Sequence, residues 1–204
     1  MRYNGPMSSP ASLSGLETLR QHLPETAGDA GRPRSKPSDW NPPFCGDIDM
    51  DIRRDGRWFY QGSVIARPAL VRLFASVLRR EGDSYFLVTP VEKVGIRVED
   101  QPFLAGQLDV SGPTDQPILR LCTTLDEWVE VSDAHPLRFD RLDRDGLAPA
   151  VLVRDNLWAR LSRPLSFELA ERGQIKRLDG TDWFGVFSRG AFFPMIEADA
   201  LDQA

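Results

Sequence analysis

The stretch that decides the fold reads RDGRWFYQG over residues 54–62, and a similar stretch, RDNLWARLS, occupies residues 154–162. Both contain Arg-Asp followed three residues later by tryptophan, and the copies lie 100 residues apart in a chain of 204. Asp55-Gly56 is typical of a tight β-hairpin turn. Each stretch is therefore predicted to be the turn and the returning strand of a hairpin, with its tryptophan on that strand.

Two further matching pairs follow in the same order along the chain. Arg-Pro stands at residues 67–68 and again at 163–164, and each pair opens a predicted helix because proline suits the first turn. GDSYFLV at 82–88 matches GTDWFGV at 180–186. The offsets of 96 and 98 residues differ from 100 only between elements, where loops absorb insertions. The three pairs predict a hairpin–helix–turn–strand unit that occurs twice.

The first half of the chain is predicted to combine strands with one helix. In DIDMDI (47–52) apolar residues alternate with three aspartates, as in a strand with one buried face. The apolar positions from Pro68 onward predict one long helix, which Gly82-Asp83 ends. Further strands are predicted at residues 57–60, 85–89 and 91–99.

The second half reads almost entirely as strand, with one helix from Pro164 to Arg172. Its strands are predicted at residues 103–110, 118–124, 128–132, 136–140, 149–155, 157–161, 174–178 and 183–187. We expect an α+β fold made of two β-rich domains related by internal duplication, each with one main helix. The predicted domains are residues 39–100 and 101–204, after an N-terminal extension of residues 1–38 that holds a short helix and a flexible linker.

Composition limits the classes of function. With 41% hydrophobic and 27% charged residues the chain is typical of a soluble globular protein, and its net charge of -5 argues against nucleic acid or an anionic membrane as partner. No apolar leader or membrane-spanning run is present, so we expect a cytoplasmic protein with reduced Cys45 and Cys122. Neither a glycine-rich phosphate loop nor a histidine-based triad occurs, and we predict no cofactor.

Several stretches resemble a bacterial family of unknown function, DUF1285. They are residues 46–50, 55–63, Arg67, 70–74, 85–93 and 96–103, and the similarity extends over roughly residue 39 to the end. The resemblance implies a duplicated two-domain fold whose C-terminal half is similar to a partly open pleckstrin-homology barrel. It also implies a ligand groove between the halves for a nucleotide-like molecule, and a role in signal transduction. It implies no catalytic residues.

Cationic and polar side chains carry the functional hypothesis. Arg67 and Arg163 precede helix starts, where unpaired N–H groups and partial positive charge suit a phosphate or carboxylate. Arg160 points away from the apolar face of its strand, and Pro90 interrupts a strand beside several polar residues. The predicted ligand-binding residues are Trp58, Tyr60, Arg67, Thr89, Glu92, Lys93, Arg160 and Arg163, with no catalytic or metal-binding residue. Core packing for the tryptophans, solvated arginines and a carboxylate partner for Lys93 are the structural alternatives.

We therefore expect a non-enzymatic protein that binds an anionic, nucleotide-like small molecule at the groove between the two units. Two alternatives stay open. One is an enzyme that acts on a small phosphorylated metabolite through Glu92 or the aspartates of residues 47–51, although those aspartates also suit a solvent-facing strand paired with nearby arginines. The other is a protein-interaction module that presents a strand edge of the C-terminal half.

Overall fold

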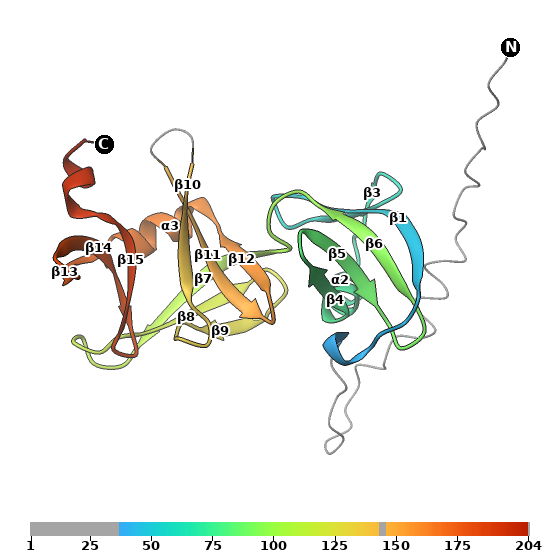
Figure 1. Ribbon diagram of the computed structural model, residues 1–204, viewed down its shortest axis with the longest axis horizontal. Helices are drawn as coiled ribbons and strands as arrows, with labels where there is room; N and C mark the ends of the chain where they lie inside the picture. Colours follow the sequence, from blue (N-terminus) through green and yellow to red (C-terminus); the bar gives the residue numbers. More distant parts are fainter. Residues whose placement is uncertain (1–36, 143–145, 204) are drawn as a thin grey trace, which may run out of the picture. The chain divides into compact units, whose positions relative to one another are not determined.

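The structure is a computed structural model that describes residues 37–142 and 146–203 (Figure 1). The short helix predicted near the N-terminus lies outside these residues. The described chain forms two compact units. The N-terminal unit contains the residues up to Met50 together with Tyr60–Arg97, and the C-terminal unit contains Asp51–Phe59 and everything from Val98 onward.

The first sheet has six strands in the order β3-β2-β1-β6-β5-β4. The alternation predicted for residues 47–52 is confirmed, because Met50 and Ile52 are fully buried and Asp47 and Asp49 are exposed. Its elements, with the short helix before it, are η1 (Pro37–Asp39), β1 (Phe44–Ile52), β2 (Trp58–Tyr60), β3 (Ser63–Val64), α2 (Pro68–Ser76), β4 (Leu78–Glu81), β5 (Ser84–Val88) and β6 (Lys93–Val98).

The prediction of one helix from Pro68 to the Gly82-Asp83 turn is wrong in its last part. The helix ends at Ser76, Val77 leaves helical geometry with φ -110° and ψ 10°, and residues 78–81 form β4. This strand pairs antiparallel with β5 over its full length. A segment as short as residues 78–81 fits a helical and an extended pattern equally well. Its pairing with β5 therefore decides that it forms a strand.

The C-terminal unit contains a curved six-stranded sheet in the order β10-β11-β12-β7-β8-β9 and a three-stranded sheet, β13-β14-β15. The second sheet curls into a partly open barrel (Figure 1), and only its β12–β7 pair is parallel. Helix α3 packs against β7 and β14. The elements are β7 (Phe103–Ser111), β8 (Ile118–Thr123), β9 (Trp128–Glu130), β10 (Leu137–Arg141), β11 (Leu147–Arg154), β12 (Leu157–Leu161), α3 (Arg163–Ala170), β13 (Gln174–Leu178), β14 (Thr181–Ser188), β15 (Ala191–Glu197) and η2 (Ala198–Gln203).

The element order confirms the predicted duplication. The β1–β2 hairpin, α2 and strands β4–β6 recur as the β11–β12 hairpin, α3 and strands β13–β15. Trp58 is the first residue of β2 and Trp158 the second of β12. Gly82 and Gly180 occupy the equivalent turns after β4 and β13, with φ of 59° and 90°. The fold is thus two β-rich halves with one main helix each.

The turn of the β1–β2 hairpin explains why the stretch of residues 54–62 contains a glycine at position 56. The Arg53 N–H donates to the Arg57 carbonyl at 2.9 Å, and the Gly56 N–H donates to the Arg53 carbonyl at 2.9 Å. Gly56 has φ 80°, a conformation that glycine adopts without strain. A Cβ there would lie 3.2 Å from the Leu104 Cβ, so the turn also packs closely against β7.

A buried serine joins the two sheets of the C-terminal unit. Ser188, the last residue of β14, is fully buried. Its hydroxyl donates to the Val131 carbonyl at 2.6 Å and accepts from the Leu119 N–H, on β8, at 3.1 Å. The three-stranded sheet is therefore held against the curved sheet by hydrogen bonds that do not belong to either ladder.

Candidate ligand-binding site

The C-terminal unit contains a pocket of about 760 Å³, which we name the C-terminal pocket. This volume falls within the range of roughly 300–1,000 Å³ that is typical of small-molecule sites. All its lining residues belong to the C-terminal unit. They are Arg54, Asp100, Leu104, Phe139, Leu142, Gly146, Leu147, Ala148, Pro149, Arg160, Leu161, Ser162, Arg163, Ser166, Phe167, Ala170 and Met195.

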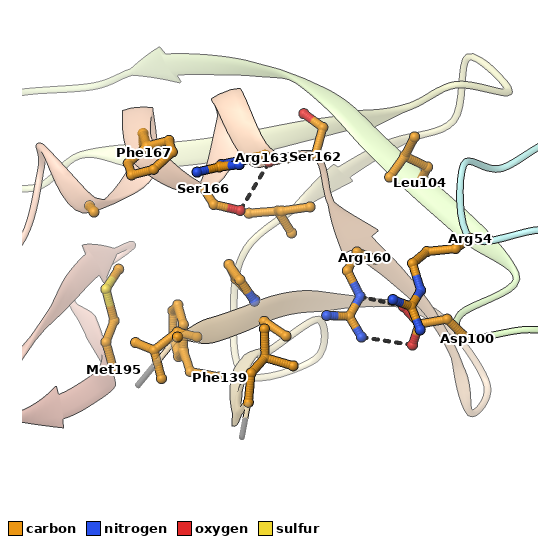
Figure 2. Close-up of a pocket in the computed structure, with 17 residues that line it drawn as sticks. Arg54, Asp100, Leu104, Phe139, Arg160, Ser162, Arg163, Ser166, Phe167 and Met195 are labelled. Carbon is orange, nitrogen blue, oxygen red and sulfur yellow. Dashed lines mark hydrogen bonds and ion pairs between the residues drawn. The ribbon is translucent and has the colours of Figure 1, made fainter. Parts of the chain in front are cut away.

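The start of helix α3 forms one side of the C-terminal pocket (Figure 2). Arg163 is the first helical residue and is exposed, and its guanidinium carbon lies 5.8 Å from the centre of the Phe167 ring. Within residues 37–142 and 146–203, no carboxylate pairs with Arg163. Its guanidinium therefore keeps its donors and its charge available, beside a helix end that carries partial positive charge.

A second arginine of the pocket is already paired. Arg160 Nη2 donates to Asp100 Oδ1 at 2.7 Å, and Arg160 Nε lies 2.7 Å from Asp100 Oδ2, as the dashed lines in Figure 2 show. These side chains are only 21% and 15% exposed, so the two-point contact is well shielded from water. Asp100 compensates the charge of Arg160 and fixes its orientation.

Arg54 lies beside this pair in Figure 2. Its backbone N–H donates to Glu99 Oε2 at 3.0 Å, while its side chain is exposed and has no carboxylate partner in the described part of the chain. With three arginines and one aspartate, the described lining residues carry a net charge of +2, whereas the whole protein carries -5. The described side chains of the C-terminal pocket thus differ in charge sign from the protein as a whole, and positive charge of this kind favours an anion over a cation.

Apart from these groups the lining is mostly apolar. Phe139 and Met195 line the pocket away from Arg54 in Figure 2. Phe167 and Leu142 are 60% and 54% exposed, which is high for side chains of their size. The pocket thus combines an apolar surface open to water with two arginines that pair with no carboxylate among the described residues.

Of the residues predicted from the sequence to bind a ligand, the structure brings Arg160 and Arg163 together in this pocket. Trp58 is 1% exposed and packs in the core, as the alternative of core packing expects. Tyr60 is half-buried at the end of β2, and Arg67 is an exposed residue that precedes the first turn of α2. The predicted groove between the two units stays a prediction.

The remaining three predicted residues lie at the turn between β5 and β6. Thr89 is fully buried, and its Oγ1 accepts the Glu92 N–H at 3.2 Å, which closes the turn. Lys93 Nζ lies 3.0 Å from a carboxylate oxygen of Glu81 and 4.9 Å from the centre of the Phe86 ring. The hydrogen bond from Lys93 holds the pKa of the Glu81 carboxyl below its ordinary value. Lys93 therefore has the carboxylate partner that the structural alternative requires.

The aspartates of β1 do not gather around one point. Asp49 pairs with Arg97, and Asp51 lies 3.9 Å from Arg53. In the described part of the chain, no group of three or more histidine, cysteine, aspartate or glutamate side chains has an arrangement that would hold a metal ion. No helix among residues 37–142 and 146–203 is long and apolar enough to cross a membrane.

Arg54, Asp100 and the two serines at the start of α3 are pocket residues that the sequence did not predict. Arg54 is the first residue of the opening motif, so the repeat itself is a signal that could have found it. Asp100 gives no such signal, because it lies 60 residues from Arg160 in the chain. Ser166 donates its hydroxyl to the Ser162 carbonyl at 2.9 Å and so stabilises the first turn of α3.

Comparison with known proteins identifies the family of this chain but assigns no activity to it. No curated protein matches the chain. A crystal structure of a DUF1285 family protein from Silicibacter pomeroyi DSS-3 is 41% identical, with a TM-score of 0.79, and the match covers 96% of this chain and 100% of that one. A DUF1285 family protein from Shewanella baltica OS155 is 28% identical over 61% of this chain and 91% of that one, with a TM-score of 0.49. The model of the N-terminal domain of DUF1285, a domain of unknown function, matches residues 37–101, and that of the C-terminal domain matches residues 102–195. The chain therefore belongs to the DUF1285 family.

Proposed function

We propose that this protein is a non-enzymatic binding protein for an anionic small molecule, which it holds in the C-terminal pocket. The observation that carries the proposal is the combination of a pocket of about 760 Å³ with two arginines, Arg54 and Arg163, whose charges no described carboxylate compensates. An anion in the pocket would supply the missing negative charge.

The lining supports binding over catalysis. Among the described lining residues the one carboxylate, Asp100, is engaged with Arg160 through both oxygens. A general base must lie within hydrogen-bond reach of the proton that it removes, and a carboxylate held by a guanidinium through both oxygens is poorly placed to turn toward a substrate. The arginine fork of Arg163, in contrast, matches the geometry of a carboxylate or phosphate group.

We propose further that the protein acts in the cytoplasm and that ligand occupancy serves signal transduction. Cys45 and Cys122 are free thiols, which suits a reducing compartment. A ligand that contacts β10, β12 and α3 together would favour the conformations in which these elements lie as they do here. A downstream partner would then distinguish the occupied from the empty protein.

The test is calorimetric titration of the full chain with a panel of anions that includes nucleoside phosphates, sugar phosphates and carboxylic acids. We expect at least one class to bind and Arg163→Gln to weaken it about 10- to 100-fold, the value of a charge-assisted hydrogen bond. Arg172→Gln is the control, because Arg172 is an exposed arginine just after α3 that does not line the pocket. Binding of no anion, or binding that Arg163→Gln leaves intact, would refute the proposal.

A further inference from the structure

The chemistry of the C-terminal pocket also narrows the class of ligand. We infer that it binds an amphipathic anion, a single alkyl or acyl chain that ends in a carboxylate or phosphate, rather than a nucleotide. This inference rests on the proposed function, since it concerns the same pocket. It is carried by the distribution of apolar and charged groups over the lining.

The apolar part of the lining suits a hydrocarbon chain. Ten of the 17 lining residues have apolar side chains, most of them aliphatic, and they come from β7, β10, β11, β12, α3 and β15 as well as the loop after β10. A nucleobase and a ribose carry several donors and acceptors that need partners once they leave water. The only hydroxyls in the lining belong to Ser162 and Ser166, and that of Ser166 already donates to a helix carbonyl. A hydrocarbon chain makes no such demand.

The exposed apolar side chains of the pocket point to the same class. Phe167 is 60% exposed and Leu142 is 54% exposed, and both line the pocket. Large apolar groups that gather at a concave surface mark a site that an apolar partner covers. A chain that enters beside Phe167 would bury this surface, which favours binding in proportion to the area removed from water.

The anionic head is best placed at Arg163. Its guanidinium, which pairs with no described carboxylate, lies 5.8 Å from the centre of the exposed Phe167 ring, so a cation and an apolar ring stand side by side, as a head group and the first carbons of a chain require. Arg160 is less suited to the head, because Asp100 occupies its fork. Arg54, which also pairs with no carboxylate in the described part of the chain, offers a second positive charge for a phosphate, which carries more charge than a carboxylate.

The experiment is calorimetric titration of the delipidated full chain with a homologous series of alkanoates from six to twelve carbons, each below its micelle concentration. Affinity should rise about fourfold for each methylene group that enters the pocket. Decanol should bind at least about tenfold more weakly than decanoate, because it lacks the charge that Arg163 recognises. Decyl phosphate compares the two head groups, and adenosine monophosphate represents the nucleotides.

Two variants locate the site. Arg163→Gln should remove most of the difference between decanoate and decanol, and Met195→Gln should flatten the dependence on chain length, since a polar group then faces the chain. Arg172→Gln, just after α3 and outside the pocket, should change neither.

The outcomes separate the two proposals. If adenosine monophosphate binds in an Arg163-dependent way and alkanoates do not, the class is wrong and the proposed function stands. If nothing binds, both fall. Chain-length dependence that survives both variants would overturn the inference by assigning the binding to another apolar surface.

Discussion

The hydroxyl of Ser188 should contribute more to stability than its size suggests. We predict that Ser188→Ala destabilises the C-terminal unit, because it removes the donor to the Val131 carbonyl and the acceptor of the Leu119 N–H. All three residues are at most 2% exposed, so water does not readily replace the lost partner. The two backbone groups would then remain buried without these hydrogen bonds.

The expected loss follows from these two contacts. A buried donor or acceptor without a partner costs about 1–3 kcal/mol. The Leu119 N–H and the Val131 carbonyl are two such groups, and the carbonyl loses less because it has a second lone pair. Together they give a loss of about 2–4 kcal/mol in the free energy of unfolding. With a denaturant slope of about 1–3 kcal/mol per molar urea, the midpoint should fall by about 1–2 M.

Urea unfolding measures this loss, and hydrogen exchange locates it. The Leu119 amide should exchange faster in Ser188→Ala than in the parent protein, by more than strands elsewhere in the unit. The control is Ser76→Ala, because the Ser76 hydroxyl also donates to a backbone carbonyl, that of Leu73 at 2.7 Å, but at an exposed position. That variant should change stability by less than about 0.5 kcal/mol.

A midpoint shift below about 0.3 M for Ser188→Ala would refute the reasoning, because it would mean that the two sheets do not depend on this contact. The same conclusion would follow if Ser76→Ala were equally destabilising. The loss would then reflect the hydroxyl as such and not its buried position between the sheets.

Three other predictions concern separate parts of the molecule. Gly185→Ala should destabilise the three-stranded sheet by about 1–3 kcal/mol, because a Cβ would lie 2.3 Å from a carbonyl oxygen of β15, and calorimetry would detect the change. The Lys93 hydrogen bond lowers the Glu81 pKa below its ordinary value of 4.5, so the stabilisation it reflects is present above that pH and is lost as the pH falls through the lowered value. Lys93→Gln should therefore make the thermal midpoint less sensitive to acid below pH 4.5, and an unchanged profile would contradict this. Finally, a thiol reagent at neutral pH should modify exposed Cys45 rapidly and Cys122 only after unfolding. The reason is that burial both shields the Cys122 thiol from the reagent and raises its pKa. Rapid modification of two thiols per folded chain would contradict this.

The sequence predicts this fold well where local patterns are long. Alternation over residues 47–52 and 157–161 identifies strands, and Arg-Pro at 67–68 and 163–164 marks both helix starts. The pattern fails at residues 78–81, where a short segment becomes a strand only because β5 is there to pair with it. Pairing partners are a property of the folded chain, which no local window contains.

The residues of the C-terminal pocket are harder to predict from the sequence than the fold is. They too depend on contacts between distant parts of the chain. Arg160 and Arg163 were found because each has a local signature, alternation in one case and a helix start in the other. The apolar lining has no such signature, since its members look like ordinary core residues of separate strands. Asp100 became recognisable as the partner of Arg160 only once the fold had brought them to 2.7 Å.

The duplication has a consequence for where a cavity can form. In the first copy the hairpin strand β1 pairs directly with β6, so its five strands form one continuous sheet. In the second copy β10 pairs with β11 and also contacts β15, so an added strand separates the hairpin from the other three strands. The C-terminal pocket is lined from β10, β11, β12 and β15 and from α3, the elements on either side of that separation. In the second copy the sheet is thus interrupted between the hairpin and the other three strands, and the C-terminal pocket lies among the elements that flank this interruption.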